Sequence, residues 1–286
     1  MSLFDRLVAE ALQSNEALGT VRAAVEKELL HHDILREMSD AGLLKDLTFI
    51  GGTCLRACYG SPRLSEDLDF TGGLDFNPRH LAHLGPTLES TLMTKYGFPV
   101  TVSAPKREDG NVSTWKLRLE TCPTEKHRPS QRIHIDVCAL NSYQKRPAFL
   151  RNDYRVDMGT EGLILQAQTR EEILADKWVA LAFRPNRVQY RDVWDILWLE
   201  RQGFKPPLEL LFRKLDDRHR DQAGFLDELE IRLAALADDP AHRRAFQLEM
   251  QRFLGKRDLR KSLSDPDLWP LVVLTLQEQY DRIARG

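Results

Sequence analysis

The sequence contains no run of about 18 apolar residues, the length that a membrane-spanning helix requires. Its first segment, residues 1–18, carries scattered acids and no apolar core of the kind found in secretory signal peptides. We therefore expect a protein with no membrane segment that works in the cytoplasm. The chain also has no internal repeat or low-complexity tract, and its many aliphatic and aromatic residues exclude disorder as the dominant state.

Cysteine is scarce, with one residue at each of positions 54, 58, 122 and 138. Cys54 and Cys58 lie four residues apart, but neither a second pair nor a nearby histidine cluster completes a zinc site. The adjacent His31 and His32 would diverge on a helix, so we expect both at the surface. The sequence thus predicts reduced thiols rather than a structural metal or a disulfide framework.

The chain has no excess of positive charge, since its net charge is −2 over 286 residues. The overall charge therefore does not indicate nucleic-acid binding, but it does not exclude local basic patches that could bind nucleic acid. Segment 243–261 holds seven Lys and Arg against two acids, a local charge of +5. On a helix it would be either an RNA-facing flank or a solvated face. The arginines at 184, 187 and 191 form a second basic group.

Hydrophobic periodicity divides the chain into three parts. Residues 1–45 have apolar positions at helical spacing, residues 46–168 read as mixed α/β with about four to six strands, and residues 169–286 return to helices. Thr169 and Glu172 form a capping box at the start of this last part. Within these parts we expect strands at 98–102, 113–120 and 131–138, helices at 78–95, 190–203, 206–217, 222–237 and 240–255, and a loop at 104–111.

The segment 49–70, F-I-G-G-T-C-L-R-A-C-Y-G-S-P-R-L-S-E-D-L-D-F, carries the clearest chemistry. A short apolar strand ends at Ile50, and Gly51 and Gly52 permit a tight turn with close backbone approach. Thr53 then stands at the expected start of a helix, where backbone N–H groups and the helix dipole favour an anion. A hydroxyl beside two glycines suits a phosphate.

Asp67 and Asp69 are two residues apart on an expected strand, so their carboxylates share a face. Two adjacent carboxylates repel each other, and a divalent cation removes that penalty. Such oxygen ligands select Mg²⁺ or Mn²⁺. The segment 131–138, Q-R-I-H-I-D-V-C, alternates so that Arg132, His134 and Asp136 share its polar face.

These motifs resemble those of the AbiEii/AbiGii nucleotidyltransferase toxins of type IV toxin–antitoxin systems, which include the mycobacterial MenT proteins. The resemblance rests on G-G-T-x-L-R followed by R-x-S-x-D-L-D-F. It continues through W-K-L-R at 115–118 to Lys177, Arg184 and the R-D-x-x-D of 191–195. It implies an α+β fold with a DNA polymerase β-like nucleotidyltransferase core, a mixed sheet and a helical C-terminal half.

The resemblance also implies roles for individual residues. The expected metal ligands are Asp67, Asp69 and Asp136, of which the third could instead accept the proton of the attacking hydroxyl. Lys177 and Asp192 are the other expected catalytic residues. The expected substrate-binding residues are Gly51, Gly52, Thr53, Arg56, Arg63, Ser65, Lys116, Arg184 and Arg191.

Some of these assignments leave alternatives open. Lys177 shares a helix face with Arg184 and either reaches the triphosphate or covers apolar surface with its stem. Asp192 either acts in the site or orients Lys177 or Arg191 by ion pairing, and Asp195 is more consistent with a structural role, capping or pairing Arg191. The tryptophans at 178, 194 and 198 fit a core better than a base-stacking surface.

The resemblance implies an enzyme that transfers NMP from an NTP to an RNA acceptor, the 3′ end of tRNA in some relatives, and so inhibits translation and growth. It also implies a cognate AbiEi-like antitoxin encoded nearby. Two alternatives remain: a nucleotidyltransferase acting on a protein or small molecule, and a catalytically silent nucleotide-binding module. The paired Asp67 and Asp69 argue against the silent module.

Overall fold

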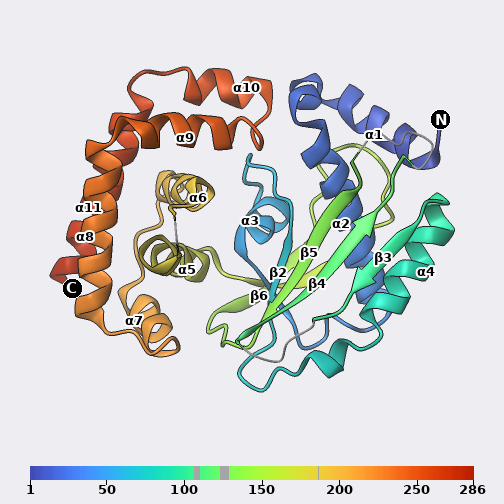
Figure 1. Cartoon of the computed structure of the whole chain (residues 1–286), viewed down its shortest axis with the longest axis horizontal. Helices are drawn as coiled ribbons and strands as arrows, with labels where there is room; N and C mark the ends of the chain where they lie inside the picture. The colour runs from blue at the N-terminus through green and yellow to red at the C-terminus, as the bar shows by residue number, and fades with distance from the viewer. Residues whose placement is uncertain (106–109, 123–128, 186) are drawn as a thin grey trace. The chain divides into compact units, whose positions relative to one another are not determined.

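The computed structural model describes residues 1–105, 110–122, 129–185 and 187–286, with the backbone alone at 260 and 261. These residues form two compact units (Figure 1). The first comprises residues 1–60 and 64–167, and the second comprises residues 61–63 and 168–286. No helix in the described ranges has both the length and the apolar character needed to cross a membrane.

The first unit is built on one mixed sheet of seven strands, ordered β3-β4-β5-β2-β1-β7-β6. Its strands are β1 (Thr48–Ile50), β2 (Leu68–Thr71), β3 (Val100–Ser103), β4 (Val112–Leu119), β5 (Gln131–Cys138), β6 (Lys145–Phe149) and β7 (Ile164–Gln168). Its helices are α1 (Leu3–Ser14), η1 (Glu16–Val21), α2 (Arg22–Asp40), α3 (Gly51–Tyr59), η2 (Pro78–Leu81) and α4 (Leu84–Tyr96).

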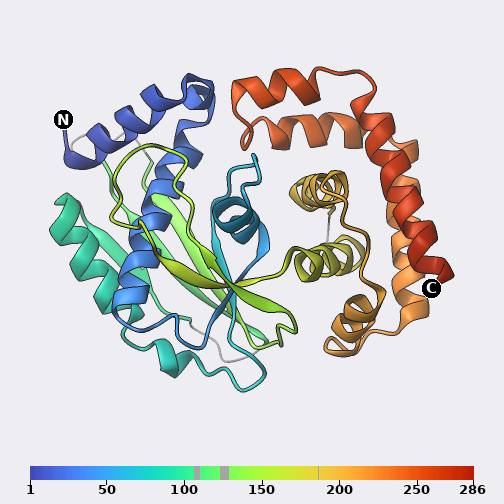
Figure 2. The same ribbon diagram turned by 180° about the vertical axis from the view of Figure 1, so that it is seen from behind.

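The two faces of the sheet differ in polarity because the strands alternate. On β5, Ile133, Ile135 and Val137 are fully buried, and Leu68 and Phe70 on β2 continue this apolar face. The helices α2 and α4 lie along the sheet in both views (Figures 1 and 2). The strand residues between these apolar ones point to the opposite face, which carries the acids of the expected site.

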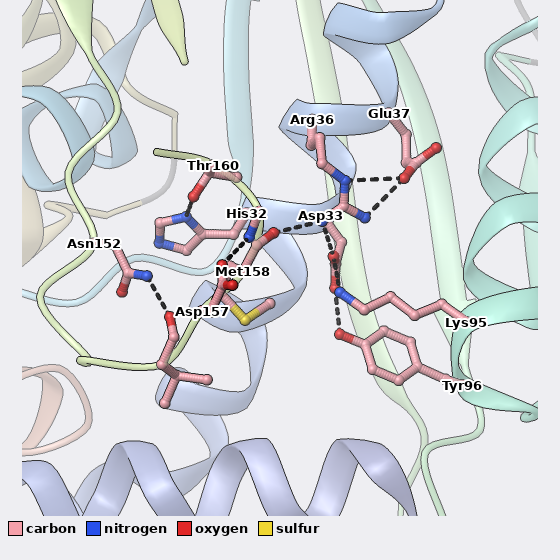
Figure 3. Close-up of polar contacts among 12 residues, drawn as sticks. His32, Asp33, Arg36, Glu37, Lys95, Tyr96, Asn152, Asp157, Met158 and Thr160 are labelled. Atoms are coloured by element: carbon pink, nitrogen blue, oxygen red, sulfur yellow. Dashed lines mark hydrogen bonds and ion pairs between the residues drawn. The ribbon is translucent and has the colours of Figure 1, made fainter. Parts of the chain in front are cut away.

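Helix α2 is enclosed nearly all round and is held by buried polar contacts (Figure 3). The Asp33 carboxylate is fully buried and accepts hydrogen bonds from Lys95, at 2.5 Å, and from the Tyr96 hydroxyl. Arg36 pairs with Asp33 at 2.9 Å and donates to a backbone carbonyl of the 150–160 loop, that of Met158. These contacts join α2 to α4 and to that loop.

The second unit is helical. Its helices are α5 (Arg170–Phe183), α6 (Tyr190–Arg201), α7 (Leu208–Asp216), α8 (Gln222–Asp238), α9 (Pro240–Met250), α10 (Lys256–Asp258), the π-helical turn η3 (Leu259–Leu263) and α11 (Leu268–Arg285). Helix α5 packs against α6, α7 and α8 and forms the centre of the unit. The Thr169 hydroxyl caps α5 by accepting the N–H of Glu172 at 3.3 Å.

Several expectations are confirmed and others are wrong. The strand at 131–138 is β5 itself, and Trp178 and Trp194 lie in the core as expected. The sheet has seven strands rather than at most six, and the expected helix at 78–95 is divided into η2 and α4. The expected helix at 240–255 ends at Met250, so segment 243–261 is not one continuous helix. Of the expected loop at 104–111, residues 106–109 lie outside the described part of the chain.

The expectation that His31 and His32 lie at the surface is wrong, since they are only 3% and 5% exposed. Nε2 of His31 lies 3.1 Å from the Glu66 carbonyl, and Nδ1 of His32 lies 2.9 Å from the Thr160 hydroxyl. Adjacent residues on a helix do diverge, but α2 is covered on both of the sides to which they point. Burial lowers the pKa of His31 to about 3 and that of His32 to about 4.

Candidate active site

The glycine turn between β1 and α3 places backbone against a carboxylate. Gly51 adopts φ +74°, a conformation that favours glycine. A Cβ atom at this position would lie 2.7 Å from Oδ2 of Asp69, closer than real Cβ contacts. Ile50 occupies the N-cap position of α3, and its side chain forms no hydrogen bond to the helix. The Asp69 carboxylate thus approaches the start of α3, where the first N–H groups of a helix have no partner within the helix itself.

The Thr53 hydroxyl, which we expected to face a phosphate, instead donates to the backbone carbonyl of Asp67. Thr53 is 1% exposed and lies in the first turn of α3. This bond joins the helix to the residue that immediately precedes β2. Thr53 therefore sets the position of the acidic strand relative to the glycine turn.

Two of the three expected metal-binding carboxylates are neighbours on the polar face of the sheet, and the third lies two residues away along the chain. Asp69 on β2 and Asp136 on β5 are direct partners in the parallel pairing of these strands. Asp67 lies two residues before Asp69, and its Oδ1 accepts the backbone N–H of His134 at 3.0 Å. The sequence could place Asp67 and Asp69 on one face, but the pairing of β2 with β5 is what brings Asp136 beside them.

The chemistry of this donor set fits a divalent cation. Oδ1 of Asp136 is buried and has no hydrogen-bond partner among the described residues, an arrangement that costs free energy unless a ligand compensates it. The Asp69 carboxylate reaches the turn through the space that Gly51 leaves open. Within the described ranges, no three His, Cys, Asp or Glu side chains converge closely enough to hold a metal ion. Asp67, Asp69 and Asp136 remain the residues that we predict would hold it.

Lys177 and the R-D-x-x-D motif form a buried ion-pair network in the second unit. Nζ of Lys177 lies 2.7 Å from Oδ1 of Asp192 and 2.8 Å from Oδ2 of Asp195. Burial alone would lower the pKa of Lys177, but Asp192 and Asp195 outweigh burial and hold that pKa above its ordinary value. The lysine is therefore a charged group held in place by two carboxylates.

Arg63 completes this network from the short segment that belongs to the second unit. Its guanidinium binds Asp195 bidentately, with Nε to Oδ1 and Nη2 to Oδ2 both at 2.8 Å. Arg63 is 2% exposed and Asp195 is fully buried. Burial would raise the pKa of Asp195, but Arg63 and Lys177 hold it below its ordinary value. Asp195, for which the pattern suggested capping or pairing with Arg191, pairs with these two cations.

The remaining cations of the second unit have different partners. Nη2 of Arg184 lies 2.9 Å from Oδ2 of Asp192, and this arginine side chain is 41% exposed. Arg191 pairs with Glu249 at 3.4 Å. Of the two ion pairs that we considered for Asp192, the structure contains the one with Lys177. Arg184 thus combines an anchored guanidinium with access to solvent.

Arg56 and Ser65 are held by a buried glutamate that the sequence reasoning missed. Oε2 of Glu28 lies 3.1 Å from Nε of Arg56 and accepts the Tyr154 hydroxyl, while Oε1 accepts the Ser65 N–H at 3.1 Å. Arg56 also pairs with Asp153 at 3.2 Å. The sequence feature that could have identified Glu28 is its position as an acid within the apolar stripe of α2. These contacts anchor α3 and the approach to β2, so that Arg56 and Ser65 face a protein partner in this structure.

Lys116 lies on β4, on the same face of the sheet as the carboxylates. It pairs in register with His134 of β5, and Thr114 pairs with Asp136. Lys116 is exposed, whereas its neighbours Trp115 and Leu117 are buried. Lys116, the basic residue of W-K-L-R, therefore lies two residues along β4 from Thr114, which is level with Asp136 and Asp69 across the sheet.

Comparisons with known proteins show which family and which fold the chain is similar to. Residues 33–271 match the family model described as nucleotidyl transferase AbiEii toxin, type IV TA system. JHP933 from Helicobacter pylori has a similar fold, with a TM-score of 0.50, 15% identity, and coverage of 92% of this chain and 94% of its own. A protein from H. pylori described as a "putative nucleotidyltransferase" gives a TM-score of 0.51, 14% identity, and coverage of 95% and 97%. No curated protein matches the chain.

Proposed function

The chain belongs to the AbiEii family of nucleotidyltransferase toxins of type IV toxin–antitoxin systems, and from this we propose that it transfers NMP from an NTP to an RNA acceptor, the 3′ end of tRNA. Blocking that end would inhibit translation and growth. The observation that carries the proposal is the pairing of Asp69 with Asp136, beside Asp67 and the Gly51 turn. We place the reaction in the cytoplasm, where tRNA is found.

In this proposal the first unit binds the reacting groups. Asp67, Asp69 and Asp136 would hold the divalent cation, Mg²⁺ or Mn²⁺, which would supply Lewis-acid stabilisation of phosphate charge when bound. The N–H groups of α3 at Gly52 and Thr53 bind phosphate oxygens, because the start of a helix favours an anion. Thr53 contributes through its backbone, since its hydroxyl is already bonded to Asp67.

The second unit supplies fixed positive charge. Lys177 is charged and held by Asp192 and Asp195, and the family resemblance supports the proposal that its ammonium group binds the triphosphate. Arg184 and Arg191 provide further cations for phosphate. Asp192 then acts by orienting Lys177 and Arg184. We assign Arg63, Arg56 and Ser65 a positioning role, because each is bonded to a buried carboxylate.

Asp136 is the better candidate for the general base. Its Oδ1 has no hydrogen-bond partner among the described residues, and in this role that oxygen would accept the proton of the attacking hydroxyl instead of binding the cation. Oδ2 of Asp192 also has no hydrogen-bond partner among the described residues, but Lys177 lies against Oδ1 and the Arg184 guanidinium lies 2.9 Å from Oδ2. A carboxylate flanked by two cations is poorly suited to accept a proton.

The family also implies an antitoxin partner, which we propose is an AbiEi-like protein encoded beside this gene. Expression of the wild-type chain should stop growth, and expression of Asp69→Asn should not. Co-expression of the neighbouring gene should restore growth. Growth arrest by Asp69→Asn at an equal protein level would contradict a catalytic origin of toxicity.

The direct test is nucleotide transfer by the purified protein. Each α-labelled NTP is offered with Mg²⁺ and total cellular RNA to the wild type, to Asp69→Asn and to Asp75→Asn. Asp75 is an exposed acid of the same unit and serves as the matched control. We expect label in a tRNA-sized band from the wild type and the control, and none from Asp69→Asn. Label in a protein band instead of RNA would overturn the proposed acceptor.

A further inference from the structure

The polar face of β4 and β5 carries a row of cations that leads away from the catalytic carboxylates. Arg132 and His134 alternate with buried apolar residues on β5, and Lys116 and Arg118 do so on β4. Lys116, Arg118 and Arg132 are exposed. We propose that these three residues, the basic strip, bind the phosphate backbone of the acceptor strand next to its reacting 3′ end. This inference rests on the proposed function, because it specifies how that function holds its acceptor.

Strand register fixes the order of the side chains along this face. Asp69, Asp136 and Thr114 lie in one row across β2, β5 and β4. The next row contains His134 and Lys116, with Asp67 beside His134, and the row after it contains Arg132 and Arg118. Rows are two residues apart, which is about 6.6 Å along a strand. The basic strip therefore lies roughly 7 to 13 Å along the strands from the row of Asp69 and Asp136, within the reach of a few nucleotides of single-stranded RNA.

The groups around the basic strip suit a phosphodiester chain. On β3, Thr101 pairs with Arg118 and Ser103 pairs with Lys116, so that exposed hydroxyls continue both rows. Within the described part of the chain, Glu120 pairs with the strip, lying 3.1 Å from Nη2 of Arg118. That ion pair is exposed, with side chains 59% and 41% accessible, so phosphate can compete for the arginine at small cost.

The strip lies on the opposite side of the carboxylates from the glycine turn. In the sheet, β2 is flanked by β1, which leads into the Gly51 turn, and by β5, which carries the strip together with β4. A nucleotide bound at the turn would therefore approach Asp69 from one side. The acceptor would approach from the side of Asp136, the residue assigned to its hydroxyl. This two-sided arrangement favours RNA over the NTP triphosphate as the ligand of the strip.

The test measures binding and acceptor use in the same variants. A labelled single-stranded oligoribonucleotide is titrated against the wild type, Arg118→Gln/Arg132→Gln and the matched control Arg6→Gln/Arg155→Gln, which removes two exposed arginines of the same unit. Each lost phosphate contact should reduce the slope of log K against log salt by about 0.7. We expect a slope reduced by about 1.4 and affinity weakened roughly tenfold or more, while the control matches the wild type.

Transfer kinetics separate the possible failures. The double variant should raise the KM for acceptor RNA and leave the KM for NTP unchanged, since the glycine turn is intact. An equal rise in the KM for NTP would assign the strip to the triphosphate and overturn the proposal. Normal RNA affinity and normal acceptor KM, with RNA still labelled by the wild type, would overturn the strip and leave the proposed function standing. A wild type that neither binds nor labels RNA would overturn both.

Discussion

Removal of the Asp195 carboxylate should strongly destabilise the second unit. Arg63 is 2% exposed and bound to Asp195 at 2.8 Å through two nitrogens, and Lys177 lies 2.8 Å away. Asp195→Ala removes the carboxylate that binds this buried guanidinium bidentately. Breaking one side of a buried ion pair costs about 3–5 kcal/mol. With a urea m value of about 2 kcal/mol/M, the unfolding midpoint should fall by roughly 2 M.

Tryptophan fluorescence during urea unfolding measures this effect, because the tryptophans at 178, 194, 198 and 269 lie in the second unit and only Trp115 lies in the first. Asp227→Ala removes an exposed acid from α8 and serves as the matched control. It should change stability by less than about 0.5 kcal/mol. A loss in Asp195→Ala no larger than in Asp227→Ala would refute the reasoning.

The pH dependence provides a second check. The folded pKa of Asp195 lies below its ordinary value, because Arg63 and Lys177 outweigh burial. A group of this kind stabilises the fold above its unfolded pKa of about 3.9, and that contribution is lost as pH falls through the lower folded pKa. The difference between wild type and Asp195→Ala should therefore be constant from pH 5 to 8. In a double-mutant cycle, Arg63→Met should cost less in Asp195→Ala than in the wild type.

Three further predictions concern the first unit. Gly51→Ala should lower the transfer rate at least tenfold, because its Cβ meets Asp69 at 2.7 Å and its φ is positive, and a rate near that of the wild type would contradict this geometry. Asp136→Asn should lower kcat about 100-fold or more at unchanged folding by circular dichroism, and full activity would exclude it as ligand or base. As the pH falls from 7.5 to 5.5, the free energy of unfolding should decrease by about 3 kcal/mol. The buried His31 and His32 stay neutral in the folded protein, whereas in the unfolded chain both histidines bind a proton with a pKa near 6.5. Urea titrations at both pH values test this, and a His31→Gln/His32→Gln variant that kept the full pH difference would contradict it.

The elements predicted well are those with strong local signals. Strand β5 alternates strictly over eight residues, and the start of α5 carries a threonine cap, so each is visible in a short window. Among the strands, those missed are β6 and β7. Strand β6, Lys145–Phe149, is the edge of the sheet, is mostly exposed and contains a proline, so it lacks the apolar alternation of an inner strand.

Partner choice among charged residues was predicted poorly. Arg63 and Arg56 stand in a motif rich in phosphate-binding residue types, and both were assigned to substrate. In the structure Arg63 binds Asp195, 132 residues away, and Arg56 binds Glu28. Ion pairs of this kind depend on which side chains a fold buries together. Residue type and spacing do not contain that information.

The chemical inventory of the site is local and can be recognised in the chain alone. A glycine turn, a hydroxyl and the two aspartates on one strand face lie within about twenty residues, because strand period and turn geometry act over short distances. The positions of Asp136 and of the Lys177 network were decided by contacts between segments that are distant in the sequence. The parallel register of β2 and β5 placed Asp136 beside Asp69, and burial in a low dielectric joined Lys177 to Asp192 and Asp195. Both depend on contacts between distant segments, which form only when the chain is folded.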